Sequence, residues 1–198
     1  MRIGLTGSIA CGKTTASDYL RALGYPIVDA DAISRALTAP GGAALPALRA
    51  AFGDGVFAGD VLDRRALGQL VFADAAQRAR LNQLLHPLII DEIVRQLDAL
   101  SGSHALVFAD VPLLYECDMA PLFDRVWVVS APRETQLARL MARDGLPREE
   151  AQRRIDAQMS LQQKAALADA VIDTGGTLED TRRQLDALLR DPRQRRKA

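Results

Sequence analysis

The stretch TGSIACGKTT, residues 6–15, decides how this chain is organised. Gly7 and Gly12 stand five positions apart, and Lys13 and Thr14 follow the second glycine directly. This spacing matches the pattern G-x-x-x-x-G-K-[ST], in which backbone N–H groups wrap a phosphate and the lysine reaches its outer oxygens. A short apolar run, RIGLT, precedes the stretch, and a helical segment follows it. Because the pattern needs this strand–loop–helix context, it predicts a phosphate-binding loop in an α/β protein.

The residues of this loop are expected to hold the phosphates of ATP together. Glycine permits the tight turn, and a helix that begins near Lys13 presents its positive N-terminal end to an anion. Lys13 can reach the β- and γ-phosphates, and the Thr14 hydroxyl can bind Mg²⁺. The predicted ATP-binding residues of the loop are Gly7, Ser8, Ile9, Ala10, Cys11, Gly12, Lys13, Thr14 and Thr15.

Cys11 has two interpretations. The first is a small space-filling residue rather than a redox sensor. The second places its thiol near the phosphates, where the helix N-terminus favours the thiolate and bound ATP slows alkylation.

The rest of the chain predicts alternating strands and helices. A helix is expected from Lys13 to Leu23, ended by Gly24. Further strands are expected at residues 26–30, 104–112, 124–131 and 169–173, and helices at 132–144, from 147 onward, and from Thr177 to about Arg190. Residues 32–100 contain no convincing strand and predict helices, with a kink or a break at Pro87. So long a helical stretch indicates an inserted subdomain.

Composition narrows the class of protein. The 198 residues carry 25 basic and 25 acidic side chains, a balance that does not suggest a nucleic-acid binder. No apolar stretch reaches membrane-spanning length, and the apolar run after Arg2 is too short for a signal peptide. Two cysteines form no disulfide framework, which indicates the cytoplasm. The basic tail RDPRQRRKA is expected to be a solvated terminus.

The loop alone leaves several classes of nucleotide-binding protein open. The chain has neither an N-K-x-D guanine motif nor an L-S-G-G-Q transporter signature. Small size and a helical insertion favour a small-molecule kinase. Another nucleoside or nucleotide kinase is the nearest alternative, and a nucleotide-dependent binding switch with no small acceptor is the alternative from a different class.

Two carboxylates follow the second predicted strand. Ligands of open parallel sheets bind outside the carboxyl ends of the strands, so Asp31 is a candidate to accept a proton from an attacking hydroxyl. Its alternative role is the N-cap of the next helix. For Asp29, capping or support of a neighbour and direct contact with a substrate both stay open.

Other polar residues are candidates for the site. Arg139 and Arg143 stand four apart, so they share a helix face, and beside a phosphate loop they suit a lid that closes over phosphates. Taken alone, such a pair is more often a solvated face. His86 is either structural or part of the site. Asp110 can position magnesium through water or cap the loop VPLLYE.

Taken together, these pieces resemble the dephospho-coenzyme A kinase family. The shared stretches follow the family's order up to about residue 176 and read IGLTGSIACGKTT, VDAD, RRALGQLVF, LNQLLHPLI, VPLLYE, RLMARDG, RIDAQMS and ADAVIDTGG. The resemblance implies transfer of the γ-phosphoryl group of ATP, with Mg²⁺, to the ribose 3′-hydroxyl of dephospho-coenzyme A. The substrates are small molecules, with no nucleic acid or membrane partner, and the enzyme is a cytoplasmic monomer or small homo-oligomer.

The resemblance also implies an architecture and a role for each site residue. It implies a P-loop kinase with a five-stranded parallel sheet flanked by helices. The nucleotide-binding core spans residues 1–30, 101–135 and 159–198, the helical acceptor-binding insertion 31–100, and the lid 136–158. The implied catalytic residues are Asp31 as the base, Lys13, and Arg139 from the lid. Arg143 adds to the ATP-binding set, and the implied acceptor-binding residues are Asp29, Asp31 and His86.

This chain departs from the family pattern inside the loop. Ser8 and Ala10 replace glycines, and Cys11 takes a serine position. Ala10 tolerates a positive φ poorly. The framing Gly7 and Gly12 are kept, so phosphate binding is expected to persist, while the effect of Ser8 and Ala10 on ATP affinity stays open. Near the end of the chain, Thr174 stands where the family often has asparagine.

Overall fold

The computed structural model describes residues 1–191. The basic tail that was expected to be a solvated terminus falls mostly on residues 192–198, outside the described residues. The chain divides into two compact units, one made of residues 1–28 and the chain from residue 96 onward, the other of residues 29–95. Among residues 1–191, no helix is both long and apolar enough to cross a membrane.

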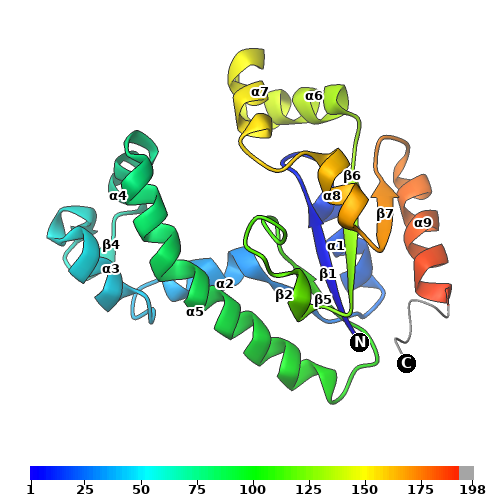
Figure 1. Ribbon diagram of the computed structural model, residues 1–198, viewed down its shortest axis with the longest axis horizontal. Helices are drawn as coiled ribbons and strands as arrows, with labels where there is room; N and C mark the ends of the chain where they lie inside the picture. The colour runs from blue at the N-terminus through cyan, green and yellow to red at the C-terminus, as the bar shows by residue number, and fades with distance from the viewer. Residues whose placement is uncertain (192–198) are drawn as a thin grey trace. The chain divides into compact units, whose positions relative to one another are not determined.

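The first unit is built on a parallel sheet of five strands (Figure 1). These are β1 (Arg2–Gly7), β2 (Ile27–Asp29), β5 (Val107–Asp110), β6 (Arg125–Ser130) and β7 (Ala170–Asp173), in the order β2-β5-β1-β6-β7. The predicted α/β class with a five-stranded parallel sheet is therefore confirmed. Because β1 lies in the middle, the loop that follows it opens at the centre of the sheet's carboxyl edge.

One face of this sheet carries the main hydrophobic core. Trp127 and Phe108 are fully buried there, with ring centroids 5.4 Å apart in an edge-to-face arrangement. Helix α1 (Lys13–Ala22) follows β1, and helix α9 (Leu178–Arg190) lies beside β7 (Figure 1). Their side chains Leu20 and Leu185 belong to the same cluster. Thr177 caps α9 as predicted, in a reciprocal pair of hydrogen bonds with Asp180.

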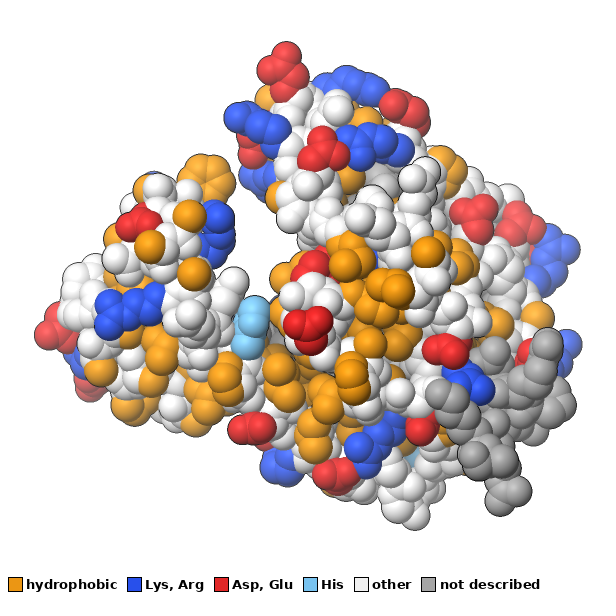
Figure 2. All heavy atoms as spheres, in the orientation of Figure 1, with side chains coloured by type: hydrophobic (Ala, Val, Ile, Leu, Met, Phe, Trp, Pro, Cys, Tyr) orange, Lys and Arg blue, Asp and Glu red, His pale blue; other side chains and the backbone are white. Residues whose placement is uncertain are grey.

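Three helices lie between β6 and β7, namely α6 (Arg133–Asp144), α7 (Arg148–Asp156) and α8 (Leu161–Leu167). The side chains of Leu137, Leu140, Ala151 and Ile155 form a buried group, here named the α6–α7 cluster. Ile9 and Ala10 of the phosphate loop pack against it. The outer surface of α6 and α7 carries acidic and basic side chains side by side (Figure 2), among them the ion pair between Arg148 and Glu134 at 2.8 Å.

The second unit is mainly helical and has its own core. Its helices are α2 (Ala30–Leu37), α3 (Leu45–Phe52), the 3₁₀ turn η1 (Asp54–Val56), α4 (Arg64–Ala73) and most of α5 (Ala75–Ser101). A further 3₁₀ turn, η2 (Ala120–Leu122), belongs to the first unit. The core of the second unit is formed by Leu48, Val56, Leu62 and Leu67.

One expectation for this segment is wrong. Strands β3 (Phe57–Ala58) and β4 (Val61–Leu62) pair as an antiparallel hairpin where only helices were expected. Strands of two residues are too short to show an alternating pattern. Of the kink or break expected at Pro87, the break does not occur, because α5 runs through this residue as one helix, and the kink stays a prediction. Leucines on both sides of Pro87, including Leu84 and Leu88, pack on one core, and this burial offsets the lost hydrogen bond.

Candidate active site

The two framing glycines of the loop are required by the space around them. Gly12 caps α1 with a φ of 86°, and a Cβ there would lie 2.9 Å from the Oγ1 of Thr174. A Cβ on Gly7 would lie 2.7 Å from the carbonyl oxygen of Val129 on the neighbouring strand. Only glycine fits both positions, so the backbone can turn tightly from β1 into α1.

Ala10 adopts a positive φ, the backbone conformation that alanine tolerates poorly. Its φ is 58°, in the left-handed region, where a residue with a Cβ carries about 1–2 kcal/mol of strain. Its methyl group packs against the α6–α7 cluster, which glycine could not do. The loop thus keeps its turn without a glycine here, with packing to offset the strain.

Lys13 is held by a carboxylate at the end of a neighbouring strand. Its Nζ forms an ion pair with Asp110, the last residue of β5, and the two side chains are 15% and 9% exposed. The two roles expected of Asp110, magnesium positioning through water and capping of the following loop, stay predictions. The ammonium group of Lys13 thus already binds an anion, the Asp110 carboxylate. A phosphate that binds Lys13 must compete with this carboxylate.

A buried lysine that was not among the predicted site residues supports the loop from α8. The side chain of Lys164 is fully buried, and its Nζ donates to Gly7 O at 3.1 Å and to Pro112 O at 3.0 Å. The same ammonium group forms an ion pair with Glu116 Oε1 at 2.9 Å, which balances its charge. The one signal in the sequence is that Lys164 lies three residues after Leu161, on the inward side of a short helix.

Arg139 lies beside the phosphate loop. Its Nη1 and Nη2 donate to the Oγ1 and the carbonyl oxygen of Thr174 at 3.1 and 2.8 Å. The Thr174 hydroxyl in turn donates to the carbonyl oxygen of Cys11 at 2.6 Å. The position where this chain departs from the family's asparagine therefore links the loop to the arginine.

Arg143 lies on the same helix but in a different setting. It is exposed, and its Nε donates to Asp144 at 2.7 Å. Within residues 1–191, Arg143 makes its hydrogen bonds to Asp144 and none to the loop, so its role in binding ATP stays a prediction.

The candidate acceptor residues belong to the second unit. Asp29 is the N-cap of α2 and accepts from the N–H of Ala32 at 2.8 Å, so the capping role foreseen for Asp31 is filled by Asp29. Asp31 is exposed in the first turn of that helix. His86 is half-buried on α5. Their proposed roles with the acceptor stay predictions.

Cys11 faces the core and not the solvent. It is 1% exposed within the main core, and burial raises the pKa of its thiol. The expected space-filling role is confirmed, whereas the expected preference for the thiolate is wrong because desolvation outweighs the hydrogen bonds from the backbone of Lys13 and Ser8.

The start of α1 offers oxygen and nitrogen donors of the kind that phosphate and magnesium need. Thr14 and Thr15 are both exposed in its first turn. Within residues 1–191, there is no group of three or more His, Cys, Asp or Glu side chains that could hold a metal ion. The Thr14 hydroxyl next to Lys13 suits a Mg²⁺ ion that takes most of its ligands from phosphate and water.

Several known proteins are similar to this chain in sequence and fold. A family model described as dephospho-CoA kinase matches residues 1–180. A dephospho-CoA kinase of Shouchella clausii is 44% identical over 193 residues, which cover 96% of this chain and 98% of that protein. The crystal structure of TT1252 from Thermus thermophilus has a TM-score of 0.82 at 38% identity and covers 96% of both chains. A dephospho-CoA kinase from Campylobacter jejuni has a TM-score of 0.66 at 27% identity, with 95% of both chains covered.

Proposed function

The chain belongs to the dephospho-CoA kinase family, and from this premise we propose that it transfers the γ-phosphoryl group of ATP to the ribose 3′-hydroxyl of dephospho-coenzyme A. The products are coenzyme A and ADP, and the reaction is the last step of coenzyme A biosynthesis. The observation that carries the proposal is the meeting of Lys13 and Arg139 at one phosphate loop, which supplies two cations around the phosphates.

These cations act on the charge that phosphoryl transfer develops. Lys13 would leave Asp110 and bind the phosphate oxygens. The Nη1 of Arg139 lies 3.3 Å from the point where a Cβ on Gly12 would be, and this side chain can turn from Thr174 toward the transferred group. Because the transition state is loose, positioning and electrostatic stabilisation supply most of the rate. Arg143 is proposed as a further ATP contact.

The acceptor hydroxyl needs a proton acceptor, and we assign that role to Asp31. It is an exposed carboxylate that follows β2 directly, within the helical unit assigned to the acceptor. Asp29, which keeps α2 in place as its N-cap, is the supporting residue, and His86 is assigned to the acceptor as well. Segment 136–158 is assigned to the lid.

Mg²⁺ is the proposed metal, and the hydroxyl of Thr14 would be its ligand from the protein. When bound, Mg²⁺ neutralises phosphate oxygens and orients the leaving group. We further propose that the enzyme acts in the cytoplasm as a monomer or small homo-oligomer, on small molecules alone.

An assay of ADP release from ATP and Mg²⁺, with and without dephospho-coenzyme A, tests the function. We expect release to depend on the acceptor, and ³¹P NMR to show a new ribose 3′-phosphate. ADP release that ignores the acceptor would indicate a nucleotide-dependent switch. Release driven by another nucleoside, but not by dephospho-coenzyme A, would indicate a different kinase.

A further inference from the structure

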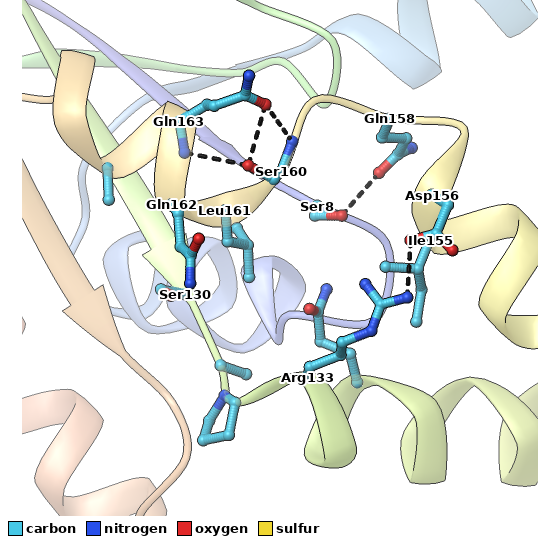
Figure 3. A pocket seen from close by; sticks show the side chains of 14 residues that line it. Ser8, Ser130, Arg133, Ile155, Asp156, Gln158, Ser160, Leu161, Gln162 and Gln163 are labelled. Carbon is cyan, nitrogen blue, oxygen red and sulfur yellow. Dashed lines mark hydrogen bonds and ion pairs between the residues drawn. The ribbon is translucent and has the colours of Figure 1, made fainter.

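Two glutamine side chains bind the backbone of one loop residue, Ile9, at its carbonyl oxygen and at its N–H. The Nε2 of Gln136, on α6, donates to the carbonyl oxygen of Ile9 at 2.8 Å. The N–H of Ile9 donates to the Oε1 of Gln158 at 2.8 Å, and the hydroxyl of Ser8 donates to the same oxygen at 3.0 Å (Figure 3). Both glutamines come from segment 136–158, more than 120 residues away in sequence, and we refer to the pair as the glutamine clamp.

Two of the side chains that make these contacts, Gln136 and Ser8, are buried, so their polar groups depend on the protein for hydrogen bonds. Gln136 is only 3% exposed, and a buried amide is retained where its hydrogen bonds are satisfied. Ser8 is 7% exposed, so its hydroxyl also depends on a protein acceptor. The clamp thus satisfies loop groups that neither β1 nor α1 can reach.

Ile9, the clamped residue, directly precedes Ala10, the one strained residue of the loop. Ala10 has a φ of 58° and relies on surrounding contacts to stay there. Ile9 and Ala10 also pack against the α6–α7 cluster, so this part of the loop is bonded and packed to the same pair of helices. A clamp on Ile9 restricts the backbone on the N-terminal side of Ala10 and so limits its escape from the left-handed region.

We infer that Gln136 and Gln158 are positioning residues that set the shape of the phosphate loop for ATP. They touch the loop and not the reacting atoms, and the inference deepens the proposed function, on which it rests for the identity of the anion. Through these two glutamines, segment 136–158 and the first half of the loop are expected to move together. Any rearrangement of α6 and α7 then changes the loop's fit to phosphate.

The surroundings of Gln158 make it the better residue to change. It borders a cavity of about 610 Å³ that is also lined by Arg133, Ser160 and Gln162 (Figure 3). Truncation of Gln158 to alanine enlarges this cavity and creates no new void in the hydrophobic core. Gln162 is an exposed glutamine on the same cavity wall, with no role in the clamp, and serves as the matched control.

The test is a calorimetric titration of the full-length protein with ATP and Mg²⁺, without acceptor. Gln158→Ala loses two hydrogen bonds, so the Kd for ATP should rise about 10-fold, whereas Gln162→Ala should leave it unchanged. In steady-state assays, the KM for the acceptor should stay within about 2-fold. Since the titration needs no acceptor, it tests the clamp even if the proposed acceptor is wrong.

A double variant separates positioning from simple destabilisation. Glycine adopts the left-handed conformation without strain, so Gln158→Ala/Ala10→Gly should recover at least half of the lost affinity on a logarithmic scale. If Gln158→Ala does not fold, Gln136→Met, which keeps the volume and removes the donor, takes its place with the same expected loss. An ATP Kd within 2-fold of the wild type, an equal rise in the acceptor KM, or no recovery by Ala10→Gly would overturn the inference.

Discussion

The phosphate loop is held by side chains from distant parts of the chain, whereas the segment 29–95 holds itself together through its own apolar core. Carbonyl groups of the loop at Gly7, Ile9 and Cys11 accept hydrogen bonds, and the donors are Lys164, Gln136 and Thr174. In the second unit, Leu48 and Leu67 form the centre, and Asp31 stands exposed at the start of a helix. The first design fixes a geometry in advance. The second leaves a carboxylate available to a ligand.

Substitution of Lys13 should have the largest effect on activity, because its positive charge lies within the phosphate loop. We expect Lys13→Ala to lower kcat by about 10³-fold or more, since one preorganised charge on the transferring group is lost. The variant also leaves Asp110 unpaired and largely buried, so its melting temperature should fall.

The double variant Lys13→Ala/Asp110→Asn is the control for that loss. It should regain thermal stability without regaining activity, as measured by scanning calorimetry and ADP release. Near-normal turnover in either folded variant would show that the loop is not the phosphate site.

Arg139 should come next, with a loss of about 10³-fold in kcat for Arg139→Ala, as for other arginines that stabilise a transferring phosphoryl group. Arg143→Ala is its partner on the same helix face and should change kcat far less, because its guanidinium is engaged by Asp144. Steady-state kinetics with both substrates varied separates the two. A rise in KM alone for Arg139→Ala would make it a ground-state clamp.

Asp31 tests the other side of the comparison, the unit that leaves its carboxylate free. Asp31→Asn keeps the shape and removes the proton acceptor, so kcat should fall by about 10²- to 10³-fold, within the usual range for a positioned general base. ATP binding, measured by titration, should not change.

Asp29→Asn is the matched control for Asp31→Asn, because asparagine also caps a helix well. Its activity should stay close to that of the wild type. If Asp29→Asn loses activity and Asp31→Asn does not, the base is Asp29. If Asp31→Asn loses ATP binding, its carboxylate acts at the metal and not on the hydroxyl.

Lys164→Met should lower the free energy of unfolding more than it lowers kcat. Removing one member of a buried pair destabilises by about 3 kcal/mol, toward the lower end of the usual range because Glu116 keeps some exposure to water. Urea unfolding measures this change. Glu116→Gln in the same background should recover part of it, and a stable Lys164→Met protein would show that the two hydrogen bonds and the ion pair contribute little.

The smallest effect is expected at Cys11. Since burial raises the pKa of its thiol, alkylation of the native protein at neutral pH should be negligible with or without ATP. A Cys117→Ser background removes the other cysteine, and mass spectrometry follows the labelling. Fast labelling that ATP slows would mean that the thiol faces the phosphates after all.

Much of the fold could be predicted because its signals are local. The glycine spacing at residues 7–12, the apolar strands and the cap at Thr177 each lie within a few neighbouring residues. The site was only partly predictable, because its contacts join distant positions. Lys13 meets Asp110 across 97 residues, and Lys164 meets Gly7 across 157. Gln158 falls in the shared stretch RIDAQMS, but nothing in that stretch shows that its partner is Ile9, 149 residues away.

The central position of β1 has a consequence for how the chain is made. Arg2 pairs in register with Val107, and Leu5 pairs with Trp127, so both neighbours of the first strand are synthesised more than 100 residues after it. A chain growing from its N-terminus must hold β1 unpaired until the whole helical insertion has emerged, and the insertion, with its own core, can fold meanwhile. The segment that binds phosphate is thus among the first to be translated and among the last to acquire its shape.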